Sequence, residues 1–140
     1  MPFTSDWVTQ FIPSWTEHVL PVLAGKPRVK WLVVGSYEGR SALWTIDNLL
    51  QGAGSEITCV DVWQGAWLTK SPIEVNFDEN VRGRTNLRKL RGRSEDILPV
   101  LPSSYFHGVY VDGSHEEDDV YRDARLCLPL LKPGAFMIFA

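Results

Sequence analysis

The apolar residues near the N-terminus of the chain follow a helical period. They recur every three or four positions, at Trp7, Val8, Phe11, Ile12 and Trp15. This spacing places side chains on one face of a helix. Ser5 or Asp6 is suited to cap that helix, Pro13 is expected to kink or restart it, and a further turn is expected before Pro21. The pattern therefore predicts a helical segment within residues 1–25.

Beyond residue 28 the pattern alternates between two periods. Five short runs rich in β-branched and apolar residues predict strands at 29–34, 56–62, 86–90, 106–111 and 135–140. The intervening amphipathic or capped segments predict helices at 41–50, 74–84, 94–101 and 116–130. Strands that alternate with helices in this way are typical of a doubly wound, mostly parallel α/β sheet with helices on both faces, that is, a Rossmann-like fold. We expect a single domain over residues 1–140, with its core at 29–140.

The last predicted strand is apolar at every position. Residues 130–134 read as the turn that feeds it. A strand buried on both faces belongs inside a parallel sheet, and an open edge there invites pairing with another chain. The pattern therefore predicts a truncated, minimal or edge-paired version of a larger α/β design, with a homo-oligomer formed through this edge. The contrary possibility is that the first helix covers the exposed surface.

Composition narrows the classes of protein and of partner. The net charge of −3 gives no field that would favour nucleic acid or an anionic membrane. Cys59 and Cys127 each lie in an apolar run, which indicates buried, reduced thiols. No apolar run approaches the ~20 residues needed to span a bilayer, and the first residues lack the pattern of a signal peptide. We therefore expect a cytoplasmic protein with neither a nucleic-acid nor a membrane partner.

Small, polar and acidic residues gather where the predicted strands end. Gly35 and Gly39 bracket the turn after the first strand, in G-x-x-x-G spacing, and Asp61 ends the second strand. Glycines there let the backbone pass close to a ligand, and an acidic side chain can accept both hydroxyls of a ribose. The structural alternatives are a tight strand-to-helix turn for the glycines and a turn cap for Asp61. Because the ends of parallel strands meet at one edge, both features favour one nucleoside site.

Asp112 and His115 follow the fourth predicted strand. A carboxylate and an imidazole three residues apart can share a metal or serve as acid and base. The alternative is that Asp112 caps the next helix and His115 is a solvated residue of its first turn.

The chain also contains a basic and an acidic cluster. The basic cluster comprises Arg82, Arg84, Arg88, Lys89, Arg91 and Arg93, and the acidic run is 116–119. We interpret both as solvated faces that pair with each other. Recognition of an anionic substrate by the basic cluster is the alternative.

Several of these motifs together resemble one family. The matching segments are Trp31–Trp44, Ile57–Trp63, Leu90–Ser94, Val109–His115 and Leu130–Gly134. The chain resembles class I S-adenosylmethionine (SAM)-dependent methyltransferases, most closely the small-molecule O-methyltransferase-like branch called methyltransferase family 24. The resemblance runs from about residue 29 to the end of the chain. It implies the SAM-binding version of the Rossmann-like fold.

The resemblance also implies a role for each matching residue. The turn residues Gly35, Ser36, Tyr37 and Gly39 would wrap the methionine part of SAM, and the cofactor-binding set extends to Glu38 and Ser41. Asp61 would hold the ribose, and Trp63 with the turn of Gly92, Arg93 and Ser94 would flank the adenine. Asp112 would lie beside the sulfonium. In metal-dependent relatives the residues matching Asp112 and His115 are a Mg²⁺ ligand and the base.

The chain departs from the family pattern at two places. Val33 stands where the family usually has an acidic residue, and the Asp-Asp pair of metal-dependent members and the last two strands of the usual sheet are absent. The resemblance therefore implies a SAM-dependent methyltransferase acting on a small-molecule acceptor, with O-methylation favoured. The alternatives are a non-catalytic SAM- or nucleoside-binding module, or a fragment of a methyltransferase. An NAD-type dehydrogenase is disfavoured because G-x-G-x-x-G is missing.

Overall fold

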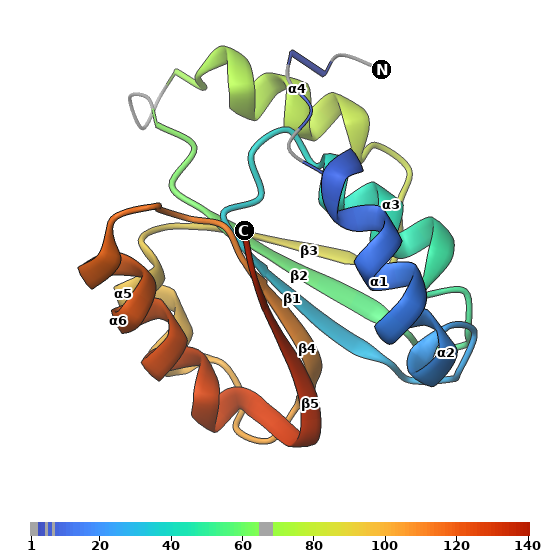
Figure 1. The fold of residues 1–140 in the computed structure, drawn as a ribbon. Coiled ribbons are helices and arrows are strands. Elements are labelled where there is room, and N and C mark those ends of the chain that lie inside the picture. Colours follow the sequence, from blue (N-terminus) through green and yellow to red (C-terminus); the bar gives the residue numbers. More distant parts are fainter. Residues whose placement is uncertain (1–2, 5, 7, 65–68) are drawn as a thin grey trace.

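The computed structural model describes residues 3–4, 6, 8–64 and 69–140, and its centre is a five-stranded parallel sheet (Figure 1). The strands are β1 (Lys30–Val34), β2 (Glu56–Asp61), β3 (Leu87–Arg91), β4 (Phe106–Val111) and β5 (Leu131–Phe139). Their order is β3-β2-β1-β4-β5, and all four pairings are parallel. The predicted doubly wound α/β fold is therefore confirmed.

Helices cover both faces of the sheet (Figure 1). One face carries α1 (Ile12–His18), α2 (Leu20–Leu23), α3 (Arg40–Asn48) and α4 (Pro72–Asn80). The other carries α5 (Ser94–Ile97) and α6 (Glu117–Cys127), with short 3-10 turns η2 (Leu98–Val100) and η3 (Leu128–Leu130). Each face buries its own apolar cluster. No helix in the described part of the chain is long and apolar enough to cross a membrane.

The N-terminal helical segment begins with the cap that the sequence predicts. Asp6 accepts hydrogen bonds from the amides of Val8 at 3.1 Å and Thr9 at 2.9 Å. A 3-10 turn, η1 (Thr9–Phe11), follows, and Pro13 stands in the first turn of α1, so the helix restarts there. The other candidate cap, Ser5, and the apolar Trp7 lie outside the described residues.

The turn predicted before the last strand is instead part of β5. Leu131 already pairs with Phe106, and the next pair joins Phe136 to Gly108, so residues 132–135 form a bulge. Gly134 within it has a φ of +77°. The local sequence pattern correctly predicts a bend here. The first residue of β5 that pairs with β4, Leu131, nevertheless precedes this bend.

Outside the site, the two cysteines lie as predicted, whereas the charged clusters do not. Cys59 and Cys127 are buried and free, as predicted, and burial raises the pKa of each thiol to about 12. The basic cluster pairs with acids other than the 116–119 run: Lys89 contacts Glu74 at 2.5 Å, and Arg84 contacts Asp47 at 2.7 Å. The predicted mutual pairing of the two clusters is therefore wrong for these residues.

Candidate functional site

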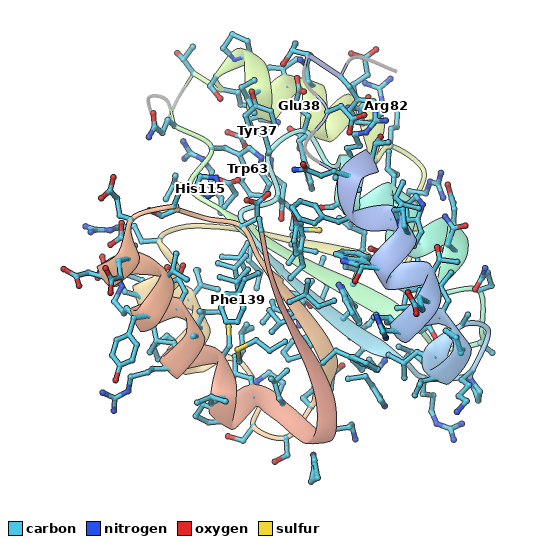
Figure 2. All side chains as sticks on the ribbon, viewed as in Figure 1. Tyr37, Glu38, Trp63, Arg82, His115 and Phe139 are labelled. Atoms are coloured by element: carbon cyan, nitrogen blue, oxygen red, sulfur yellow. The ribbon has the colours of Figure 1, made fainter. Side chains whose placement is uncertain are left out.

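A cavity of about 550 Å³ lies beyond the carboxyl ends of β1, β2 and β4. The order of the sheet reverses between β1 and β4, and ligands of doubly wound sheets bind at such a reversal. The described lining residues are Gly35, Tyr37, Asp61, Val62, Trp63, Gln64, Ser71, Ile73, Asp112, Gly113 and His115. Figure 2 shows Tyr37, Trp63 and His115 close to this edge of the sheet. The volume is within the range of small-molecule sites, roughly 300–1,000 Å³.

Gly35 lets the turn after β1 touch the end of β4. Its φ is +91°, and a Cβ there would lie 2.3 Å from the backbone oxygen of Asp112. Only glycine satisfies both constraints. Gly39, with a φ of +84°, immediately precedes α3. The two glycines thus make a tight turn, as the structural alternative holds, and the same turn brings Tyr37 to the cavity.

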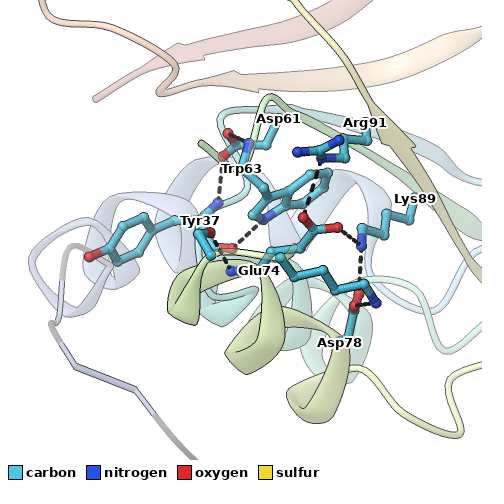
Figure 3. Close-up of polar contacts among 9 residues, drawn as sticks. Tyr37, Asp61, Trp63, Glu74, Asp78, Lys89 and Arg91 are labelled. Atoms are coloured by element: carbon cyan, nitrogen blue, oxygen red, sulfur yellow. Dashed lines mark hydrogen bonds and ion pairs between the residues drawn. The ribbon is translucent and has the colours of Figure 1, made fainter. Parts of the chain in front are cut away.

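Asp61 serves the turn and the cavity at once. Its Oδ2 accepts a hydrogen bond from the Tyr37 amide at 2.8 Å, and its Oδ1 accepts one from the Trp63 amide at 2.9 Å (Figure 3). A carboxylate has about four acceptor sites, so both oxygens retain capacity for further donors. Asp61 is therefore a turn cap that can also bind hydroxyl groups in the cavity.

Asp112 and His115 face the cavity from the other side. The His115 Nε2 lies 3.8 Å from Asp112 Oδ1, and the imidazole side chain is 75% exposed. Burial raises the pKa of Asp112 above its ordinary value, the nearby Asp61 adds to the rise, and His115 opposes it. The arrangement therefore disfavours negative charge on Asp112 until a cation is near.

Several residues of the predicted cofactor set do not line this cavity. These are Ser36, Glu38, Gly39, Ser41, Gly92, Arg93 and Ser94. Glu38 is 1% exposed, and its carboxylate accepts hydrogen bonds from the Thr4 amide at 2.7 Å and from Asn76 at 2.8 Å. It therefore ties the N-terminal segment and α4 to the turn. The Arg93 guanidinium pairs with Glu95 near the surface.

Gly92 and Ser94, from the predicted adenine turn, line a second cavity of about 110 Å³. It shares Gly35 and Asp61 with the first cavity, so the two spaces adjoin. Ser94 Oγ donates a hydrogen bond to the buried Asp123 at 2.6 Å, and burial raises the pKa of Asp123. The small cavity thus extends the site toward the position expected for adenine.

Five lining residues of the first cavity were not predicted as site residues. They are Val62, Gln64, Ser71, Ile73 and Gly113. Ser71 had a usable signal, because it precedes a proline and caps α4 by accepting a hydrogen bond from the Glu74 amide at 3.2 Å. That cap places the first turn of α4 against the cavity. Val62 and Ile73 carry only apolar side chains, which give no such signal.

The described residues do not fit a magnesium site. No group of three or more His, Cys, Asp and Glu side chains is placed in them to hold a metal ion. Asp112, the tentative metal ligand, lies 3.8 Å from His115 but is in no such group. The expectation of Mg²⁺ therefore has no support among these residues.

Fold and site together define a class: doubly wound α/β proteins with a small-molecule cavity at the point where strand order reverses. The family model described as "Methyltransferase domain" (Methyltransf_24) matches residues 32–140, and the chain belongs to this family. No curated protein is similar enough in sequence to count as a relative.

Solved structures share the fold at low sequence identity. A SAM-dependent methyltransferase from Mesorhizobium loti has a TM-score of 0.63 and 18% identity, covering 92% of this chain and 51% of its own. Fibrillarin from Aeropyrum pernix, solved with natively bound SAM, has a TM-score of 0.60 and 23% identity, covering 84% and 47%. The cyclase SpnF has a TM-score of 0.64 and 20% identity, covering 96% and 46%. This chain therefore spans about half the length of these proteins.

Proposed function

We propose that this protein binds SAM in the cavity and transfers its methyl group to a small-molecule acceptor, with an oxygen atom as the methylated position. The observation that carries the proposal is the charge of the lining. Two carboxylates, Asp61 and Asp112, face the cavity, and the described lining contains neither lysine nor arginine. Such a site attracts the positive sulfonium of SAM and repels the pyrophosphate of NAD. The SAM found in the similar fibrillarin structure supports the same ligand.

Each part of the ligand has residues suited to it. Asp61 would accept the ribose hydroxyls, and the turn at Gly35 and Tyr37 would hold the methionine part. Gly92 and Ser94 in the adjoining cavity would lie along the adenine. When bound, SAM supplies an electrophilic methyl group on a positively charged sulfur. The chain's own task is then alignment and exclusion of water, which are large contributions to catalysis.

His115 is the residue suited to handle the acceptor proton. Its exposed imidazole lines the cavity 3.8 Å from Asp112. A hydroxyl that is being methylated must lose its proton, and a neutral imidazole within reach can take it. The Asp112 carboxylate would then stabilise the imidazolium that forms.

Calorimetric titration of the purified protein with SAM, S-adenosylhomocysteine and NAD tests the proposal. We expect SAM to bind, S-adenosylhomocysteine to bind more weakly because it lacks the sulfonium charge, and NAD not to bind. Asp61→Asn should weaken SAM binding by about 1–3 kcal/mol, the worth of a hydrogen bond to a charged group. Asp96→Asn, an exposed position on α5, is the matched control. Binding of NAD alone would contradict the proposal.

The second candidate is a non-catalytic SAM-binding module. The cyclase SpnF shares the fold, and a shared fold does not by itself imply a shared reaction. Incubation with methyl-labelled SAM and a panel of catechols, phenols and hydroxy acids separates the two candidates. Label transferred to an acceptor supports the enzyme, whereas tight SAM binding without transfer supports the module.

A further inference from the structure

A closed ring of hydrogen bonds joins the turn after β1 to the end of β2 (Figure 3). The Trp63 indole Nε1–H donates to the Tyr37 carbonyl at 2.8 Å. The Tyr37 amide donates to one oxygen of Asp61, and the Trp63 amide donates to the other, at 2.8 and 2.9 Å. Each of the three residues is thus bonded to both of the others.

The ring holds two residues in an unfavourable backbone conformation. The φ of Tyr37 is +50°, and the φ of Trp63 is +43°. Left-handed backbone costs bulky residues of order 1–3 kcal/mol each and persists only where the surroundings enforce it. The three hydrogen bonds bind the backbone of both residues and so contribute to holding this conformation.

Packing against Phe77 and Lys89 also holds the Trp63 indole in place. Trp63 is 2% exposed. The centroids of the Trp63 and Phe77 rings are 4.7 Å apart, and the Lys89 Nζ lies 5.0 Å from the centroid of the Trp63 ring. Lys89 in turn pairs with the buried Glu74 at 2.5 Å, and Glu74 also meets Arg91 at 3.2 Å (Figure 3). Rotation of the indole would therefore disturb the partly buried ion pairs that satisfy the buried Glu74 carboxylate.

From this geometry we propose that Trp63 is a positioning residue. Its indole N–H fixes the Tyr37 carbonyl, and through the ring this orients the Asp61 carboxylate so that its remaining acceptor sites face the cavity. This role is distinct from flanking the adenine, because it depends on the indole N–H and its hydrogen bond to Tyr37 and not on the face of the ring. This inference rests on the proposed function, since the oriented carboxylate would receive the ribose hydroxyls of SAM.

The test removes the indole N–H and measures two nucleosides by calorimetry. Trp63→Phe keeps an aromatic ring but loses the donor. Trp31→Phe is the matched control, because Trp31 is also buried and its indole N–H has no hydrogen-bond partner among the described residues. Adenosine carries the hydroxyls that Asp61 would bind, and 2′,3′-dideoxyadenosine lacks them. Replacement of Trp63 by 3-benzothienylalanine, which has sulfur in place of N–H, repeats the test at nearly constant volume.

Trp63→Phe should bind adenosine about 5- to 30-fold more weakly than the wild type, the effect of losing one buried hydrogen bond. Its affinity for dideoxyadenosine should be unchanged, the benzothienylalanine protein should behave like Trp63→Phe, and Trp31→Phe should behave like the wild type. Equal loss for both nucleosides, or no loss for either, overturns the positioning role and leaves the proposed function standing. A wild-type protein that binds neither adenosine nor SAM overturns both.

Discussion

At the scale of single residues, the Asp112 carboxylate lowers the stability of the free protein, and the same negative charge favours binding of a cationic ligand. Its carboxyl group is largely removed from water and lies close to Asp61, and burial is the main cause of its raised pKa. A buried carboxylate beside a second carboxylate is destabilising until a cation reaches it. The free protein therefore bears a cost at this position that a sulfonium ligand would relieve.

The first prediction concerns the pH dependence of that cost. Below the ordinary Asp pKa of 3.8 the Asp112 carboxyl is protonated in both states and costs nothing. As pH rises through that value and then through the higher folded-state pKa, the unfolded chain loses its proton more readily, so the free energy of unfolding falls. Asp112→Asn removes this fall and should raise the melting temperature at pH 7.

Thermal melts from pH 3 to pH 8 check the prediction. The difference between Asp112→Asn and the wild type should vanish toward pH 3. Glu79→Gln, an exposed position on α4, should show no such difference. A melting temperature for Asp112→Asn below that of the wild type at pH 7 would show that the carboxylate stabilises the free protein.

The second prediction concerns His115. If the protein transfers methyl groups to a hydroxyl, His115→Ala should lower turnover by roughly 10²–10⁴-fold through loss of the base, with SAM affinity nearly unchanged. The imidazole is exposed, so its removal leaves the fold intact. Steady-state rates and calorimetry on the same samples give both quantities. Unaltered turnover would return His115 to the role of a solvated residue near the start of α6.

Some residues of the site can be predicted from their residue type and position in the sequence, and others cannot. Gly35 and Asp61 could be predicted, because a glycine and an acid at successive strand ends serve few purposes other than a close turn and a hydroxyl contact. Glu38 could not be placed in the same way. Its carboxylate bonds to Thr4, 34 residues earlier, and no local pattern reveals such a partner.

At the scale of elements, the turn between β1 and α3 combines two constraints that can be separated by mutation. Gly35 has a positive φ and no room for a Cβ, whereas Gly83, after α4, has a φ of +84° and nothing within 4 Å of a Cβ. Gly83→Ala should cost only the backbone strain, about 1 kcal/mol.

Gly35→Ala should cost the same strain and also an overpacking penalty of about 1–3 kcal/mol, because its Cβ would meet the backbone of Asp112. Urea unfolding of both variants measures the difference. We also expect Gly35→Ala to lose SAM binding, since the turn would have to move away from β4. Equal destabilisation of the two variants would mean that the turn accommodates a Cβ at position 35 with no overpacking penalty.

Element boundaries were predictable where a strong local signal exists. The glycine at 35 ends β1, and Ser71 followed by Pro72 begins α4, two residues before the apolar period suggests. The helix expected at 116–130 divides into α6 and η3 because Pro129 cannot continue an α-helical ladder. The bulge in β5 was not predictable, because the pairing of Leu131 with Phe106 is a tertiary contact.

At the scale of the whole molecule, β5 is one of the two edge strands of the sheet, and both of its apolar faces are partly covered. Phe136 and Ile138 pack against the cluster that contains Trp15 of α1, and Met137 packs against the cluster on the opposite face. The sequence leaves cover by the first helix as an alternative to self-association, and Trp15 of that helix is a member of the cluster on one face. Such cover does not pair the open edge, because backbone groups there point sideways, in the plane of the sheet.

The edge of β5 is the basis of the last prediction. Among the described residues β5 pairs only with β4, and the Ala140 amide donates to Val111, so by alternation the Phe139 amide points to the open edge. Phe139 is also 43% exposed. We propose that the 140-residue chain forms a two-fold dimer in which β5 of each copy pairs with the other, since such pairing satisfies the open donors and acceptors of both.

Sedimentation velocity over a range of protein concentrations tests this dimer. Phe139→Pro removes one outward amide without removing a bond to β4, and proline is tolerated at strand edges, so this variant should remain monomeric. Phe139→Thr removes the exposed ring but keeps the amide, so it should still dimerise if the backbone provides the contact. A wild-type chain that stays monomeric at high concentration would contradict edge pairing. Loss of the dimer in Phe139→Thr as well as in Phe139→Pro would instead assign the contact to the phenyl ring, which both variants lack.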